Sequence, residues 1–141
     1  MLISRSIIII FVIIFNINFV FGNSITIKVK VHDKIITNID IESEIKYLLF
    51  LNPKLNELEN SRLEKIAKNS LITEIIKKKE LEKFFDFKKE NNLTDLIEKR
   101  LLIKKNIKNK NELIEILKKR EINYNIIKQK LIIETMWNQL I

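Results

Sequence analysis

Cysteine is absent from the sequence, and glycine, proline and histidine each occur once among its 141 residues. Without cysteine the chain can form neither disulfides nor thiolate metal sites, so its stability must come from packing alone. The one glycine, Gly22, leaves none for a phosphate-binding loop or a nucleophile elbow, because both depend on glycine backbones. These absences exclude several large classes of enzyme.

The scarcity of glycine and proline also limits the fold. An all-β sandwich with many tight turns is disfavoured, because asparagine has to fill the positive-φ positions that glycine normally takes. Apolar residues make up 46% and charged residues 31%, a balance typical of folded chains. The length predicts a single domain with a core of its own.

The formal charge of +8 comes from 26 lysines and arginines against 18 acidic residues. Ile, Lys and Asn are abundant together, as is typical of a genome poor in G and C. The lysines occur singly or in short runs such as Lys77 to Lys79, and acidic residues interrupt them throughout. Binding to nucleic acid requires a clustered basic face, and the sequence contains no recognisable motif of the usual nucleic-acid-binding modules. We therefore expect no nucleic-acid partner.

Residues 1–22 have the pattern of a secretory signal peptide. Arg5 provides a short positive region, and the stretch from Ile7 to Phe15 is continuously apolar. The pattern predicts cleavage between Gly22 and Asn23, and therefore export of residues 23–141.

An uncleaved membrane anchor is the alternative interpretation of this segment. A spanning helix needs about 20 apolar residues, and Asn16 and Asn18 interrupt the apolar run near its end. The sequence therefore favours a cleaved signal, with no stable membrane span in the exported chain.

The exported part begins with a pattern typical of a β-hairpin. Apolar and polar residues alternate from Ile25 to Val31, the period of a half-buried strand, and Lys34 to Thr37 form a second short apolar segment. His32 and Asp33 lie between them. The pattern predicts a hairpin with a two-residue turn that lacks the usual glycine.

After the hairpin the apolar period becomes that of helices. Asp40 is the predicted cap of a helix that runs to about Leu51, and Pro53 follows its end. Asn56 with Glu59 forms a capping-box pattern that predicts the start of a long helix running to about Phe84. The inward stripe expected on the first helix is Ile41, Ile45, Leu48 and Leu49.

The long helix is apolar on more than one face, so it should be the central element, packed from two sides with Leu71 buried on both flanks. Its apolar residues are Leu63, Ile66, Ala67, Leu71, Ile72, Ile75 and Ile76.

Three more helices are predicted, each from an asparagine. The first begins at Asn91 or Asn92, the second at Asn109 with Glu112, and the third at Asn123. Ile122 and Ile127 form a hydrophobic staple at the start of the third. The residues expected inside are Leu93, Leu96, Ile97 and Leu101, then Leu113, Ile116 and Leu117, then Leu131, Ile133, Trp137 and Leu140.

The sequence thus predicts a mainly α fold, with a short N-terminal β-hairpin and a bundle of about five helices around one long central helix.

The sequence shows no pattern of residues that is typical of a catalytic site. His32 is the single histidine, and its place in a turn predicts a solvated side chain. The acidic pairs on the predicted helices stand two residues apart, so they do not face each other. We expect no enzyme activity, no metal and no cofactor.

The aromatic residues leave two interpretations open. Tyr47, Phe50, Phe84 and Phe85 lie near predicted helix ends, where aromatic side chains commonly close a bundle. The alternative is that they line an apolar groove for a client or partner chain. In that case the final helix, with Ile133, Trp137 and Leu140, should border the groove.

In this order the segments resemble the amino-terminal chaperone segment of SurA-type periplasmic folding factors. The likeness spans nearly all of residues 23–141, behind a signal peptide. The residues that carry it are a strand ending near Val31, Ile36-Thr37 and Asp40; Ser70 to Glu74; Asn111 to Leu113 with Leu117 to Ile122; and Tyr124, Gln129, Leu131 and Trp137 to Ile141.

The resemblance implies a periplasmic chaperone, or holdase, that binds unfolded outer-membrane proteins through apolar surface. In the family this segment leads into parvulin-type prolyl isomerase domains, and a later helix returns to pack on it. Neither is found in these 141 residues, so isomerase activity does not carry over and an apolar groove should remain unfilled. The alternative function is a structural subunit that dimerises or pairs with a separate chain, such as an isomerase.

Overall fold

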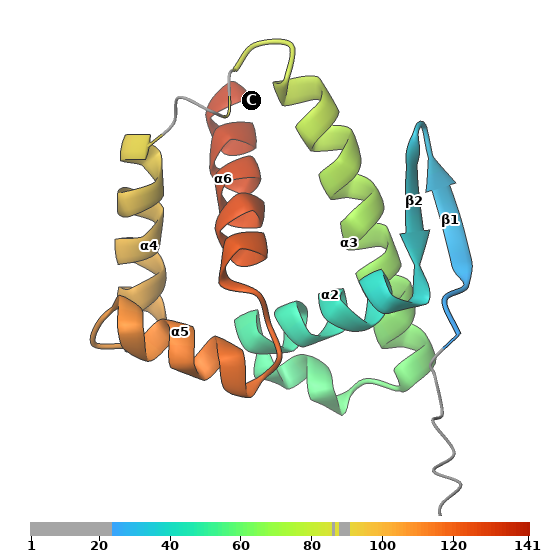
Figure 1. Ribbon diagram of the computed structural model, residues 1–141, viewed down its shortest axis with the longest axis horizontal. Helices are drawn as coiled ribbons and strands as arrows, with labels where there is room; N and C mark the ends of the chain where they lie inside the picture. The colour runs from blue at the N-terminus through green and yellow to red at the C-terminus, as the bar shows by residue number, and fades with distance from the viewer. Residues whose placement is uncertain (1–23, 86, 88–90) are drawn as a thin grey trace, which may run out of the picture.

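The computed structural model describes residues 24–85, 87 and 91–141 (Figure 1). The predicted signal peptide and its cleavage site between Gly22 and Asn23 lie outside these residues. Over the described part, a two-stranded antiparallel hairpin is followed by five α-helices and one short 3-10 helix. The predicted mainly α fold with an N-terminal hairpin is confirmed.

The hairpin consists of β1 (Ile27–Val31) and β2 (Lys34–Thr37). Val31 pairs with Lys34, so the turn is the predicted two-residue turn of His32 and Asp33. His32 adopts a φ of 52° and thereby takes the left-handed position without a glycine. In Figure 1, β2 is the strand nearer the helices.

The cap of helix α2 (Asn38–Leu51) is Thr37, three residues before the predicted cap Asp40. The Asp40 carboxylate accepts a hydrogen bond from the Thr37 backbone N–H at 2.7 Å, which completes a capping box. At the other end, the ammonium of Lys105 donates to the carbonyl oxygens of Phe50 and Leu51, each at 2.7 Å. A lysine from a distant helix therefore satisfies the last carbonyls of α2.

The buried stripe of α2 differs from the prediction, because two layers of the core cover the helix from different sides. Its buried residues follow a spacing of three, while Ile45 and Leu48 are only half-buried and pack toward the hairpin. The predicted inward residue Leu49 is also half-buried. The buried set is Ile41, Glu44, Tyr47 and Phe50.

The predicted start of the long helix is wrong. Asn52 accepts a hydrogen bond from the backbone of Lys54 and opens a separate 3-10 helix, η1 (Pro53–Glu57), which takes in Asn56. The long helix α3 (Asn60–Leu81) begins after it, with Glu59 at the N-cap and no side-chain cap. The proline and its own asparagine cap form a turn that separates the two helices.

Helix α3 is the central element, since it contacts β2, α2 and α6 (Figure 1). Its wide apolar arc is nevertheless only partly covered. Leu71 is half-buried rather than buried on both flanks, and Ile76 is exposed. The hairpin, which covers this part of α3, is only two strands wide, and it leaves a hollow beside them that is described below.

The remaining helices are α4 (Asn91–Lys105), α5 (Lys110–Lys119) and α6 (Tyr124–Leu140). The predicted caps are confirmed: the side chain of Asn109 accepts from the Glu112 N–H at 3.0 Å, and that of Asn123 accepts from the Asn125 N–H at 2.8 Å. Not all the residues expected in the core of these helices are buried. Leu96 is exposed and Ile116 is half-buried.

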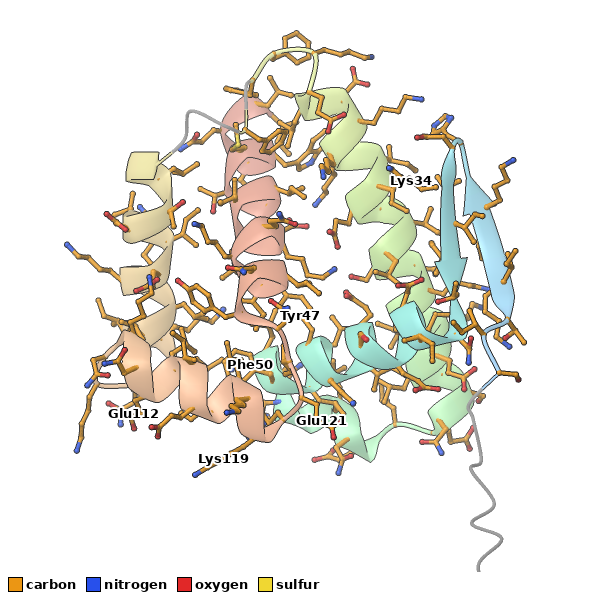
Figure 2. The ribbon with its side chains drawn as sticks, in the orientation of Figure 1. Lys34, Tyr47, Phe50, Glu112, Lys119 and Glu121 are labelled. Atoms are coloured by element: carbon orange, nitrogen blue, oxygen red, sulfur yellow. The ribbon has the colours of Figure 1, made fainter. Side chains whose placement is uncertain are left out.

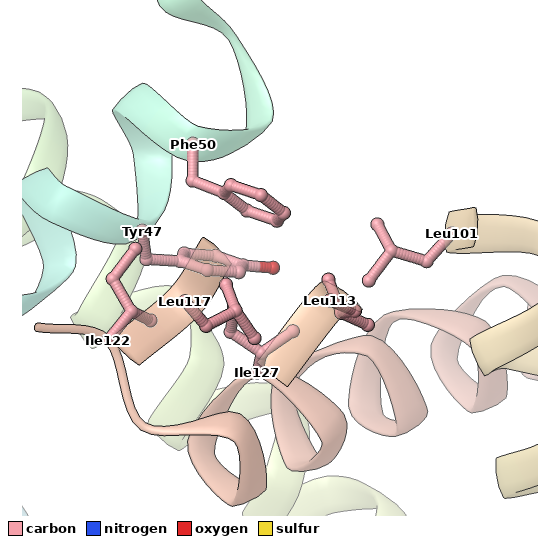
Figure 3. Close-up of a cluster of buried hydrophobic side chains, with 7 residues drawn as sticks. All are labelled: Tyr47, Phe50, Leu101, Leu113, Leu117, Ile122 and Ile127. Carbon is pink, nitrogen blue, oxygen red and sulfur yellow. The ribbon is translucent and has the colours of Figure 1, made fainter. Parts of the chain in front are cut away.

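Three clusters of buried side chains form the core. The largest lies where α2, α4, α5 and α6 meet, and it contains both predicted staple residues (Figure 3). A second joins α3, α4 and α6, and a third joins the hairpin, α2 and α3. The members of the largest are Tyr47, Phe50, Leu101, Leu113, Leu117, Ile122 and Ile127.

Two helices end on left-handed residues that are not glycine. Asn106 follows α4 with a φ of 53°, and Glu121 follows α5 with a φ of 56°. The next residue in each case bonds back to the helix: the N–H of Ile107 to the Leu102 carbonyl and that of Ile122 to the Leu117 carbonyl, both at 2.9 Å. These are Schellman caps, which glycine normally completes.

Glu121 should therefore carry a conformational cost that glycine would relieve. We expect Glu121→Gly to be more stable than Glu121→Ala by about 1 kcal/mol, because a Cβ is strained at positive φ. Both variants remove the ion pair that Glu121 forms with Lys46, so the difference isolates the backbone. Urea unfolding of the two proteins measures it, and equal midpoints would contradict it.

Candidate functional site

The residues predicted to line a client groove are distributed over different parts of the structure. Tyr47 and Phe50 belong to the largest core cluster, and Ile133 is buried in the second (Figure 3). Phe85 and Trp137 are half-buried against that second cluster. These five side chains follow the packing interpretation of the aromatic residues.

Phe84 and Leu140 are the predicted groove residues that are exposed, Phe84 to 63%. They lie near the ends of α3 and α6, whose neighbouring residues pack together in the second cluster. The structure therefore does not bring the seven predicted residues together on one surface.

A buried ionic network was missed by the sequence analysis. The Lys130 ammonium on α6 contacts the carboxylate of Glu44 on α2 at 2.7 Å, and it also binds Glu74 on α3. Glu44 accepts a hydrogen bond from the Ser70 hydroxyl at 2.6 Å. The contact between Lys130 and the second oxygen of Glu44 has ion-pair distance without hydrogen-bond geometry. Three helices are thus joined by one lysine.

The sequence did hold a signal for this network. Glu44 stands three residues from both Ile41 and Tyr47, so it occupies the buried stripe of α2, and it is 1% exposed. Lys130 is likewise three residues from Ile127 and from Ile133, which are both buried, and is itself 7% exposed. Because an unpaired buried charge is costly, a charged residue on the apolar stripe of one helix predicts an opposite charge on a neighbouring helix.

The charges of the network act on the side chain of Tyr47. The Lys130 ammonium lies 5.3 Å from the centre of the Tyr47 ring, close enough for a cation–π contact. The pKa of Tyr47 is raised far above its usual value, first by burial and then by the negative charges of Glu44, Glu74 and Glu134. Its phenol therefore stays protonated and neutral throughout the physiological range.

A groove of about 690 Å³ lies between β2 and α3, and we call it the β2–α3 groove. Apolar side chains from both elements line it together with charged residues of both signs. Its lining residues are Asp33, Lys34, Ile35, Ile36, Asp40, Leu71, Glu74, Ile75, Lys78, Lys79 and Glu82.

A smaller hollow of about 250 Å³ lies between α2, α3 and the start of α6. Its lining includes all three charged members of the ionic network together with Tyr47. Asp40, Leu71 and Glu74 line both hollows. The network is therefore placed to hold α2, α3 and α6 in the relative positions that keep both hollows open.

Both hollows are lined by apolar side chains and by charges of both signs, and the β2–α3 groove also borders a strand. Over residues 24–85, 87 and 91–141, no group of three or more histidine, cysteine or acidic side chains is arranged to hold a metal ion. None of the helices in that same part of the chain combines the length and apolarity that crossing a bilayer requires. The features present suit the binding of a polypeptide segment.

Comparison with known proteins identifies no relative of this chain. No protein-family model matches the chain, and neither the curated proteins nor the solved structures give a significant match. The resemblance to SurA-type chaperones therefore stays a prediction that rests on the residues themselves.

Proposed function

We propose that the protein is a periplasmic holdase that binds extended segments of unfolded outer-membrane proteins in the β2–α3 groove. The observation that supports this most is the position of an unpaired strand edge beside a hollow that apolar and charged side chains line together. Within the described residues the sheet has two strands, so β2 pairs with β1 on one side and with no strand on the other. Its residues Lys34, Ile35 and Ile36 line the groove.

A strand edge binds extended segments with little regard to their sequence. Added to β2, a client segment would gain main-chain hydrogen bonds, which every residue except proline can supply. Its side chains on one face would lie toward Leu71 and Ile75, and those on the other face would lie beside Ile35. Transmembrane barrel strands alternate apolar and polar residues in this period, so an unfolded outer-membrane protein presents many such segments.

The charges around the groove fit a carrier of varied clients. Lys34, Lys78 and Lys79 lie among the lining residues together with acidic ones such as Glu74 and Glu82. Because the groove carries charges of both signs, few client sequences would be strongly repelled by it. The specificity for clients would then come from their extended shape and their apolar content.

The proposal predicts that the purified protein suppresses aggregation of an outer-membrane barrel protein diluted from urea, and that Ile35→Asp weakens this effect. Ile35 is 51% exposed and lines the groove, so a carboxylate there should disrupt client binding more than folding. We expect the protein concentration needed for half suppression to rise about tenfold, as the loss of one apolar contact of this size implies. Light scattering measures it.

Ile103→Asp is the matched control, because Ile103 is exposed on α4 and does not line the groove. It should suppress aggregation as the unaltered protein does. Equal loss in both variants, or no suppression by the unaltered protein, would refute the proposal. A stable homodimer without suppression would instead favour the alternative, a structural subunit that pairs through this groove.

A further inference from the structure

The scatter of lysines among acidic residues has one exception, a stretch that holds most of the net charge of the chain. Residues 98–121 hold nine of the 26 lysines and arginines but only four of the 18 acidic residues, so they carry +5 of the formal +8. We call this stretch the basic corner. It comprises the carboxyl-terminal half of α4, the following loop and α5, which meet at one corner of the fold (Figure 1).

The fold brings the carboxyl-terminal ends of α4 and α5 together. The Lys105 ammonium and the Arg120 guanidinium lie 5.2 Å and 5.8 Å from the centre of the same Phe50 ring. Lys119 extends from the outer side of α5 (Figure 2). The exposed cations of the corner are Lys99, Arg100, Lys104, Lys108, Lys110, Lys118, Lys119 and Arg120.

Three of the four acidic groups of the corner hold specific partners, and the cations remain in excess of them. Glu98 pairs with Lys110 at 3.0 Å, and Glu121 pairs with Lys46 from α2. The Glu112 carboxylate accepts a hydrogen bond from the Lys108 backbone at 2.8 Å. The pKa of Lys105 is lowered, first by burial and then by the charges of Lys104 and Arg120, as expected where cations crowd together.

An apolar side chain projects among these cations. Ile103 on α4 is 81% exposed. It lies beside a hollow of about 460 Å³ whose lining includes Lys99 and Lys108. Isolated exposed apolar residues are common on protein surfaces. An exposed isoleucine that shares a hollow with two lysines has the composition of a surface that enters the headgroup region of a bilayer.

We propose that the basic corner binds the surface of an anionic phospholipid bilayer, with Ile103 entering the interface. A second copy of this chain would bring like charge against the corner and be repelled. Single-stranded nucleic acid is usually held by stacking on exposed aromatic rings, and in the described part of the corner no aromatic residue occurs. Anionic headgroups complement the lysines, and the acyl boundary takes the isoleucine. This surface is separate from the β2–α3 groove.

The test is sedimentation of the purified protein with vesicles of phosphatidylcholine containing about one third phosphatidylglycerol. We expect binding to these vesicles, none to pure phosphatidylcholine, and loss of binding in about 0.5 M salt as charges are screened. The triple variant Lys104→Gln, Lys108→Gln, Lys119→Gln should bind about a hundredfold more weakly, since each lysine near an anionic surface contributes about fivefold. Ile103→Ser should weaken binding further.

The matched control is Lys28→Gln, Lys30→Gln, Lys65→Gln, which removes the same charge from exposed positions on β1 and α3. It should retain most of the binding. Equal loss in both triples would show that total charge alone matters and would overturn the proposal, as would absence of vesicle binding. Binding to duplex DNA or RNA without binding to vesicles would assign the corner to nucleic acid instead. If circular dichroism shows the first triple to be unfolded, Lys99→Gln with Lys118→Gln replaces it.

Discussion

Replacement of Lys130 by methionine is expected to reduce the free energy of unfolding by about 3 to 5 kcal/mol. The substitution keeps most of the side-chain volume but leaves the carboxylate of Glu44, which is 1% exposed, without its cation. An unpaired charge in the core is among the largest single penalties that a substitution can impose. Urea unfolding followed by the fluorescence of Trp137 measures the loss.

Two further variants test whether the unpaired charge is the cause. Glu44→Met combined with Lys130→Met removes both charges, so it should recover a large part of the loss. Lys77→Met removes a comparable pair with Glu134 at 2.8 Å, in which Glu134 is exposed, and should cost less than about 1 kcal/mol. A Lys130→Met protein as stable as the Lys77→Met protein would show that Glu44 has other partners or access to water.

The second large effect is expected at Leu81. Its side chain is fully buried at the end of α3 in the second core cluster, so Leu81→Ala should cost about 2 to 5 kcal/mol. That is a substantial share of the stability of a domain of this size. Leu71→Ala, on the same helix, should cost less than about 2 kcal/mol, because Leu71 is half-buried and borders two hollows. Equal losses at the two positions would mean that the hollows are filled in solution.

Local signals in the sequence predicted much of this fold. Asn109 and Asn123 cap helices as expected, because a cap depends on backbone groups two or three residues away. The hairpin follows from alternation over a few residues on either side of His32. Asn56 has the spacing of a capping box with Glu59 but caps no helix, because Asn52 and Pro53 open a 3-10 helix that includes it.

The candidate sites could not be predicted in the same way, because they depend on how helices far apart in the chain are placed. The ionic network joins residues of α2, α3 and α6, and periodicity gives no pairing between helices. The β2–α3 groove exists because a narrow hairpin covers α3 incompletely, a result of tertiary placement. Tyr47 and Phe50 are core residues rather than parts of one surface with the other predicted groove residues, because aromatic side chains near helix ends are equally suited to filling a core.

The position of α6 determines when two of the three core clusters can form. Ile127 on α6 belongs to the largest core cluster, Ile132 and Met136 belong to the second, and Leu131 packs against both. Because α6 follows every other described element, neither cluster can be completed while the earlier helices alone have left the ribosome. Until α6 has been synthesised, α2, α4 and α5 therefore expose the apolar side chains that it covers, and only the cluster of the hairpin, α2 and α3 can form without it.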